Sequence, residues 1–172
     1  MSEIHVCGLA AMPRVLDALP GAYLVSVLPP TEQPRTPRSV PSTRHHRMQV
    51  HDIAAPMPGH VLPEREHVEE LIAFLRGADR DAPMVIHCLA GVSRSSAAAM
   101  IALALDAPGQ EAAASGAVRA ASAYALPNRR IVSLADEVLG RDGRLLAALD
   151  AMPSADLSSI RGHYILPRRL AE

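Results

Sequence analysis

Residues 83–105 place the tightest constraint on the fold. Residues 83–87 form a short apolar run ending in His87, of the type found in a buried central strand. Residues 95–105 are rich in alanine and almost entirely apolar, which predicts a buried helix. Residues 88–94 lie between them as a loop. A strand, a loop and a helix in direct succession are typical of a parallel α/β sheet.

The rest of the chain repeats this alternation and then becomes helical. Apolar runs at residues 4–9, 23–28 and 48–53 predict three further strands. Helical patterns occupy residues 13–19, 63–77 (with Pro63 as first helical residue), 110–125, 128–139 and 145–152. Residues 29–47 and 54–62 are rich in proline and predict long loops. We therefore expect an α/β fold with a mostly parallel central sheet of four to five strands flanked by helices.

Length and composition limit the classes of protein to consider. A chain of 172 residues predicts one domain, over residues 1–152, followed by a loosely ordered tail at 153–172. Its 49% apolar and 20% charged residues, with net charge −1, are ordinary for a soluble protein and do not indicate a nucleic-acid partner. We find no signal peptide or membrane segment, so a cytoplasmic location is the default. All 17 basic residues are arginine, and alanine is abundant, which suggests a bacterial genome rich in GC.

The loop after the central strand carries a strong motif. Cysteine and arginine are separated by five residues, with histidine before the cysteine and serine on each side of the arginine. We expect this combination by chance on the order of once in ten thousand such chains. The motif comprises His87, Cys88, Leu89, Ala90, Gly91, Val92, Ser93, Arg94 and Ser95.

Each residue type in this loop suits chemistry on phosphate. Backbone N–H groups and a helix N-terminus converge after the strand and favour both a phosphate dianion and a thiolate at Cys88. Glycine at position 91 permits a conformation or a close approach that a side chain would obstruct. The planar fork of Arg94 can bind two phosphoryl oxygens, and Ser95 can donate its hydroxyl to the sulfur. The loop therefore predicts a nucleophile and a phosphate-binding cradle built from Leu89, Ala90, Gly91, Val92, Ser93 and Arg94.

The motif from His87 to Ser95 resembles that of the protein tyrosine phosphatase superfamily, nearest its small dual-specificity and bacterial tyrosine-phosphatase-like branches. The resemblance covers roughly residues 4–140. It implies a dual-specificity-phosphatase-like fold and hydrolysis of phosphotyrosine, or phosphoserine and phosphothreonine, in proteins through a phosphocysteine intermediate on Cys88. It implies neither a metal nor another cofactor. The oligomeric state is not indicated.

The resemblance also implies a general acid upstream of the cysteine. Asp52 lies 36 residues before Cys88 and opens a loop containing proline and glycine, which could close over substrate. Glu64 and Glu66 are the alternatives, although carboxylates are favoured in the first turn of a helix in any case. By analogy with relatives, Asn128 is a candidate to support the phosphate loop or the hydrolytic water.

The sequence allows alternative interpretations of two residues, of the function and of a basic cluster. His87 is either a hydrogen-bonded histidine that orients the loop or a proton carrier. Cys7 is either a core thiol or a resolving partner for Cys88. Small phosphate esters, sulfur transfer or arsenate reduction, and non-catalytic phosphate binding are the alternative functions. A basic cluster either is solvated or recruits an acidic substrate; it comprises Arg35, Arg38, Arg44, His45, His46 and Arg47.

Overall fold

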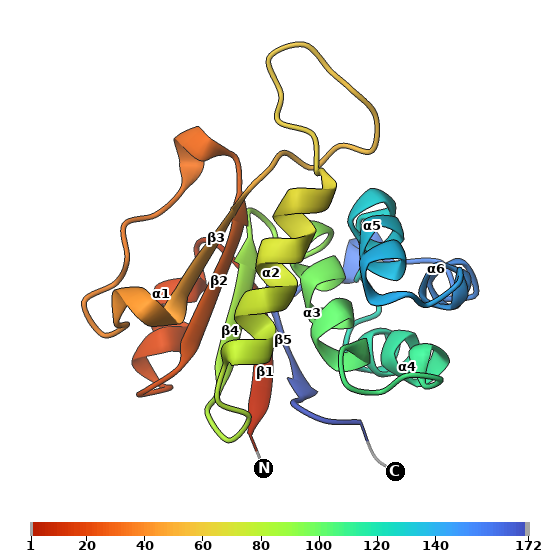
Figure 1. The fold of residues 1–172 in the computed structure, drawn as a ribbon. Helices are drawn as coiled ribbons and strands as arrows, with labels where there is room; N and C mark the ends of the chain where they lie inside the picture. Colours follow the sequence, from red (N-terminus) through yellow and green to blue (C-terminus); the bar gives the residue numbers. More distant parts are fainter. Residues whose placement is uncertain (1, 171–172) are drawn as a thin grey trace.

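The computed structural model describes residues 2–170 and contains one five-stranded sheet. The strands are β1 (Glu3–Gly8), β2 (Tyr23–Leu28), β3 (His45–Gln49), β4 (Met84–Cys88) and β5 (His163–Pro167), in the spatial order β3-β2-β4-β1-β5. Four strands run parallel, and β5 pairs antiparallel with β1 (Figure 1). The predicted α/β class with a mostly parallel sheet is confirmed.

Helices cover the sheet unequally. Within residues 2–170, α1 (Met12–Asp17) is the only α-helix that packs on one face, together with the segment that joins β2 to β3. The other face carries α2 (Arg65–Gly77), α3 (Arg94–Ala104), α4 (Glu111–Ala121), α5 (Arg129–Leu139) and α6 (Arg144–Asp150) (Figure 1). All eleven residues of α3 are buried, because this helix lies between the sheet and the outer helices. The helix that follows the cysteine loop is therefore the centre of the larger core.

Three local predictions differ from the structure. The third strand begins at His45 rather than residue 48, because His45 hydrogen-bonds to the buried Ser26 and His46 stacks on Phe74 at the sheet edge. The chain then leaves the sheet, so residues 50–53 are not part of the strand. Helix α2 begins at Arg65 rather than Pro63, since the Glu64 and His67 side chains form a capping box around its first turn.

The expected loose tail is also wrong for part of its length. Strand β5 lies within it and completes the sheet beside β1. Tyr164 and Leu166 point into the core, and the Tyr164 hydroxyl is 2.8 Å from Ser96 Oγ at the start of α3. Alternation of buried and exposed side chains therefore fixes this segment as an edge strand.

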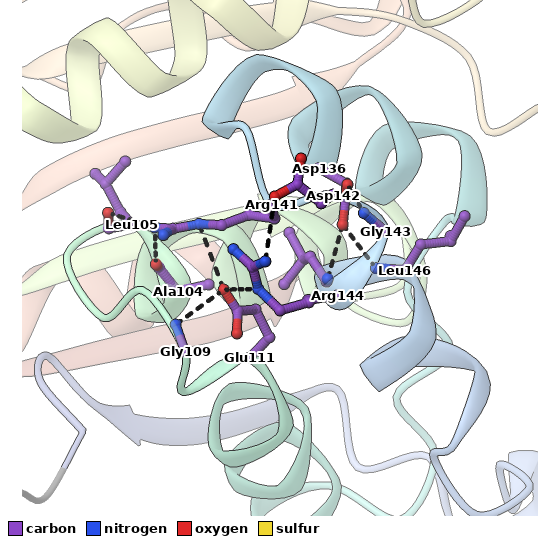
Figure 2. A network of polar contacts seen from close by, with 11 residues as sticks. Ala104, Leu105, Gly109, Glu111, Asp136, Arg141, Asp142, Gly143, Arg144 and Leu146 are labelled. Carbon is purple, nitrogen blue, oxygen red and sulfur yellow. Dashed lines mark hydrogen bonds and ion pairs between the residues drawn. The ribbon is translucent and has the colours of Figure 1, made fainter.

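A buried polar network fixes the outer helices against α3. The Arg141 guanidinium donates to the carbonyls of Ala104 and Leu105 and lies 3.6 Å from Glu111, which is itself buried (Figure 2). Asp136 accepts from the backbone N–H groups of Gly143, Leu145 and Leu146 at the start of α6. These contacts hold the end of α3 and the α5–α6 turn as one unit.

Candidate active site

The loop of residues 88–94, here called the Cys88 loop, joins the buried strand β4 to α3. Cys88 is the last residue of β4, and Arg94 is the first of α3. The tight turn depends on Gly91, whose φ of +75° lies in the left-handed region. A Cβ there would lie 2.7 Å from the Cys7 carbonyl carbon and 2.8 Å from the Gly8 nitrogen. Only glycine fits this contact without a shift of the backbone.

The Cys88 loop thus rests on the end of β1. The Leu9 N–H donates to the Leu89 carbonyl across 3.1 Å, and a Cβ at Gly8 would approach that same oxygen to 3.1 Å. Two glycines on facing segments therefore allow the two backbones to approach each other closely. This contact connects the first strand to the cysteine motif, and no sequence pattern in residues 4–9 indicated it.

Cys88 lies at the base of the loop, and the residue is 2% exposed. Its Sγ is 3.1 Å from Ser95 Oγ and accepts a hydrogen bond from the Gly91 N–H at 3.3 Å. The first turn of α3 begins beside it, and the dipole of this eleven-residue helix favours negative charge there. The arrangement suits a sulfur anion.

A backbone carbonyl outside the Cys88 loop orients the Arg94 guanidinium. Its Nη1 donates to the Val50 carbonyl across 3.0 Å, and the residue is 6% exposed. Within residues 2–170 its Nε meets no hydrogen-bond acceptor. The guanidinium is therefore oriented by one backbone contact and keeps donors for another partner.

The structure brings Asp52 to the Cys88 loop. Oδ1 of Asp52 accepts hydrogen bonds from Ser93 Oγ at 2.7 Å and from Asn128 Nδ2 at 2.8 Å. The carboxylate is exposed, and both contacts fall on the same oxygen. Ser93 therefore uses its hydroxyl to hold this acid rather than to cap α3.

Asp52 opens a loop that stands out from the body at the end of the sheet where β4 ends (Figure 1). The base of this Asp52 loop, residues 52–60, is closed by two hydrogen bonds between His51 and Val61. The His51 N–H donates to the Val61 carbonyl at 2.9 Å, and the Val61 N–H donates to His51 Nδ1 at 2.8 Å. All residues from Ala54 to His60 are exposed. The loop is fixed at its neck and solvated at its tip.

Asn128 has two structural roles. Its Oδ1 accepts from the Ile131 N–H and so caps α5, while its Nδ2 donates to Asp52. The Asn128 N–H also donates to the Ser93 carbonyl at 3.2 Å. The residue therefore connects three segments that are far apart in the sequence.

The alternative acids lie elsewhere. Glu64 caps α2 and pairs with Arg130 at 3.0 Å, and Glu66 lies exposed in the first turn of the same helix. Neither has a hydrogen bond to the Cys88 loop within the described part of the chain. Asp52 is the carboxylate that the fold brings to the cysteine motif.

Cys7 is a core residue on the opposite face of the sheet. It pairs in register with His87 on β4, so its side chain shares the face of His87 and packs in the α1 cluster. Cys88 belongs to the larger cluster on the α3 side. Burial raises the pKa of the Cys7 thiol to about 12, and Cys88 adds to the shift. A disulfide needs Cβ atoms within about 4.5 Å, which this placement across the sheet does not favour.

His87 is fully buried, and its Nε2 lies 2.7 Å from Ser26 Oγ on β2. Ser26 was not among the sequence-predicted site residues. The signal was present, since it is the only hydroxyl-bearing residue inside the otherwise apolar 24–28 run. An isolated polar residue at a buried position requires a partner, and here the partner is the histidine before Cys88.

No group of three histidine, cysteine, aspartate or glutamate side chains in residues 2–170 is arranged to hold a metal ion. No helix in the same range is long and apolar enough to cross a membrane.

The sheet order and the cysteine loop at its carboxyl edge define the class: a parallel α/β protein whose Cys-x5-Arg loop joins a central strand to a buried helix. A family model described as protein-tyrosine phosphatase matches residues 33–123, which is more than half of the chain. The chain belongs to the protein-tyrosine phosphatase family, as the motif predicted. It is accordingly a protein phosphatase, a hydrolase of phosphoric monoesters.

Solved structures give one further comparison. The crystal structure of a mouse protein described as a dual specificity phosphatase, complexed with zinc tungstate, is similar with a TM-score of 0.49. The two chains are 23% identical, and the similarity covers 81% of each. No curated protein matches the chain significantly.

Proposed function

We propose that the protein hydrolyses phosphomonoesters in two steps, with Cys88 as nucleophile, Arg94 as phosphate clamp and Asp52 as general acid and then base. One observation carries the proposal: Asp52 is hydrogen-bonded to Ser93, inside the loop that begins with Cys88 and ends with Arg94. A nucleophile, a clamp and an acid held on one loop are the groups that this chemistry requires.

In the first step the Cys88 thiolate attacks phosphorus and the bond to the leaving oxygen breaks. The Gly91 N–H and the Ser95 hydroxyl stabilise the sulfur anion before attack. Arg94 and the backbone N–H groups of residues 89–93 bind the equatorial phosphoryl oxygens. The Val50 carbonyl supports this role of Arg94, because it orients the guanidinium while Nε keeps its proton available.

Asp52 donates its proton to the leaving oxygen in the same step. Its Oδ1 is held by Ser93 and Asn128, so Oδ2 is the oxygen that can carry and transfer the proton. The exposed tip of the Asp52 loop can move over bound substrate while the His51–Val61 contacts hold its base.

In the second step a water molecule attacks the phosphocysteine. Asp52, now ionised, accepts a proton from the water molecule. At the same time the water oxygen bonds to phosphorus and the phosphorus–sulfur bond breaks. The Ser95 hydroxyl donates a hydrogen bond to the departing Cys88 sulfur. The distance of 3.1 Å between Ser95 Oγ and Cys88 Sγ supports this role. Inorganic phosphate and the resting thiolate are the products.

The substrate is a phosphoprotein, with phosphotyrosine preferred and phosphoserine or phosphothreonine as further substrates of a dual-specificity enzyme. Apolar surface beside the entrance supports contact with a peptide, because Leu89 on the Cys88 loop and Leu126 beside it are 57% and 51% exposed. The Leu126 N–H donates to the Val92 carbonyl, which places it at this loop. Two free, buried cysteines support a reducing, cytoplasmic setting, which cell fractionation would test.

Replacement of each cysteine in turn tests the nucleophile. For Cys88→Ser we expect no turnover of p-nitrophenyl phosphate or of a phosphotyrosine peptide, with vanadate binding retained. Cys7→Ala is the matched control and should keep wild-type turnover. Retained turnover in Cys88→Ser would exclude Cys88 as nucleophile. Small phosphate esters, arsenate and thiosulfate are assayed beside the peptides, and a preference for any of these would reject the phosphoprotein substrate.

A further inference from the structure

Large apolar side chains gather on the surface around the Cys88 loop. Within residues 2–170, the large apolar side chains that are at least 44% exposed are Met57, Leu89, Leu126, Leu157, Ile160 and Ile165. Single exposed apolar residues are normal on a protein surface, but a group of them around one site marks a contact surface. Backbone contacts place four of the six beside the Cys88 loop.

Two of these four lie on the Cys88 loop or against it. Leu89 follows Cys88 directly, and its carbonyl accepts from the Leu9 N–H at the end of β1. Leu126 is tied to the other end of the loop, because its N–H donates to the Val92 carbonyl at 2.9 Å. One exposed leucine is thus fixed at each end of the loop.

The other two lie on residues 156–162, the segment that leads into β5. At its start the Asp156 N–H donates to the Ala123 carbonyl at 2.9 Å, and at its end the Gly162 carbonyl accepts from the Gly8 N–H at 3.0 Å. The segment therefore runs between the α4–α5 connection and the end of β1, which are the two stretches that also contact the Cys88 loop. We call Leu89, Leu126, Leu157 and Ile160 the apolar rim.

The backbone around the apolar rim carries little charge. Residues 8–11, 89–93 and 122–127 contain no charged residue, and residues 156–162 carry one charge of each sign. Arg119 lies close by, but it donates to the carbonyls of residues 122, 123 and 125. A peptide lying over the rim therefore meets mainly apolar side chains.

The basic cluster in residues 35–47 does not alter this conclusion. Arg44 donates to the Gly21 carbonyl, and Arg47 donates to the Pro34 carbonyl. His46 stacks on the Phe74 ring. These contacts are internal, so the observations favour a supporting role for these three residues over recruitment of an acidic substrate.

We propose that the apolar rim contacts the residues on either side of the phosphorylated residue and selects substrates in which those residues are apolar. The inference rests on the proposed activity on phosphoproteins. A phosphorylated side chain that reaches the Cys88 sulfur brings its flanking residues onto this surface, so the substrate is the occupant that the position of the rim favours. Contact removes apolar surface of both partners from water, whereas an acidic flanking residue would lose water without gaining a partner.

Binding to the inactive Cys88→Ser variant measures this preference without turnover. The probes are three phosphotyrosine peptides of one length, with leucine, alanine or glutamate on both sides of the phosphotyrosine. We expect the leucine peptide to bind about tenfold more tightly than the alanine peptide, because partial burial of apolar side chains favours the complex. The glutamate peptide should bind most weakly. Equal dissociation constants for the leucine and alanine peptides would overturn the proposal.

Substitutions on the surface assign the preference to the apolar rim. Leu126→Ser and Ile160→Ser, each combined with Cys88→Ser, should reduce the preference to about threefold, whereas Leu126→Met should retain it. Ile165→Ser is the matched control. Ile165 is 44% exposed, but its neighbours Tyr164 and Leu166 face the larger core, so its own side chain lies on the opposite face of β5. An undiminished preference in both rim variants would overturn the proposal.

Turnover by the active enzyme separates this inference from the proposed function. The values of kcat/KM for the three peptides should follow the same order as their affinities. Turnover of none of them would refute the proposed function, while the binding preference would still support the rim.

Two further measurements identify other occupants of the apolar rim. Turnover per enzyme should not depend on enzyme concentration, and the enzyme should not sediment with vesicles of phosphatidylcholine and phosphatidylglycerol. A fall in turnover at high concentration that Leu126→Ser abolishes would assign the rim to a second copy of the chain. Sedimentation with vesicles that Leu126→Ser abolishes would assign it to a lipid surface. Either result would overturn the proposal.

Discussion

The side-chain amide of Asn128 donates to Oδ1 of Asp52 across 2.8 Å, although the two residues are 76 positions apart. The same side chain caps α5 through its oxygen, which accepts from the Ile131 N–H. The position of the proposed acid is thus tied to the start of a helix. A substitution at Asn128 can separate these two functions, because aspartate caps a helix as well as asparagine does but has no N–H to donate.

For Asn128→Asp we expect the cap to survive and the contact with Asp52 to become repulsive. The free energy of unfolding should stay within about 1 kcal/mol of wild type. The turnover of phenyl phosphate should fall about tenfold, equivalent to about 1.4 kcal/mol in the barrier. Asn128→Ala removes both interactions and should cost about 1 kcal/mol of stability as well. Thermal unfolding and steady-state kinetics check both variants. Full activity in Asn128→Asp would show that Asn128 acts only as a cap.

Asp52→Asn should reduce kcat by roughly 10²- to 10⁴-fold at neutral pH on substrates with poor leaving groups. The loss should be smaller for p-nitrophenyl phosphate, because nitrophenolate leaves with little help from a proton. A series of aryl phosphates of increasing leaving-group pKa, assayed on wild type and variant, measures the difference in slope. Glu64→Gln is the control, since Glu64 caps α2 and pairs with Arg130. Parallel slopes for wild type and Asp52→Asn would assign the proton to another group.

Gly91→Ala should disrupt the Cys88 loop, because a Cβ would collide with the backbone of Cys7 and Gly8. We expect turnover to fall more than about 100-fold, since a displaced loop misaligns nucleophile and clamp. Gly109→Ala is a matched control. Its φ of +86° imposes the same left-handed strain, about 1 to 2 kcal/mol, but its Cβ would meet nothing within 4 Å. Comparable losses of activity in both variants would show that strain alone, rather than the collision, is responsible.

Acid should destabilise the protein partly through Glu111 (Figure 2). Burial alone would raise its pKa, but hydrogen bonds from its own N–H and that of Gly109, with Arg144 and Arg141 nearby, lower the pKa below the ordinary 4.5. A carboxyl with a lowered pKa in the folded state stabilises fully above its unfolded pKa and loses that contribution as pH falls through the folded one. Stability should therefore decline from about pH 4.5 downward.

Glu111→Gln tests this pH dependence by unfolding in urea at several pH values. The variant should lose about 1 to 3 kcal/mol at pH 7 and show a shallower acid decline than wild type. Arg144→Ala removes a half-exposed partner and should cost less than about 1 kcal/mol. An acid decline in Glu111→Gln as steep as in wild type would assign the effect to other carboxylates.

The sequence predicted the Cys88 loop well because its determinants are local. The apolar strand, the cysteine motif and the apolar helix follow one another without interruption. The apolar composition of the helix alone indicates that it is buried, whatever packs against it. Asp52 was predicted from the family resemblance together with its distance from Cys88, but its contacts with Ser93 and Asn128 depend on how three segments pack. Contacts between distant segments produce no periodic pattern in the sequence.

The errors in the strands have a common physical origin at the sheet edges. Strand β3 begins in the polar residues His45 and His46, whose burial is stabilised by Ser26 and Phe74 rather than by their own hydrophobicity. In β5 only Tyr164 and Leu166 face the core. An alternating pattern with two buried positions is too short to distinguish a strand from a loop. Edge strands are half solvated, and their composition therefore resembles that of connecting segments.

The antiparallel pairing of β5 with β1 has a consequence for biosynthesis. β1 is synthesised before β5, its partner on one side, and helices α1 to α6 lie between the two in the sequence. Until then β1 presents an open edge, the kind of surface that invites intermolecular pairing. The Cys88 loop rests on this same strand. In a nascent chain the sheet that supports the reactive cysteine is therefore incomplete until residue 167 has been synthesised. A ribosome stalled before that point would expose an aggregation-prone intermediate.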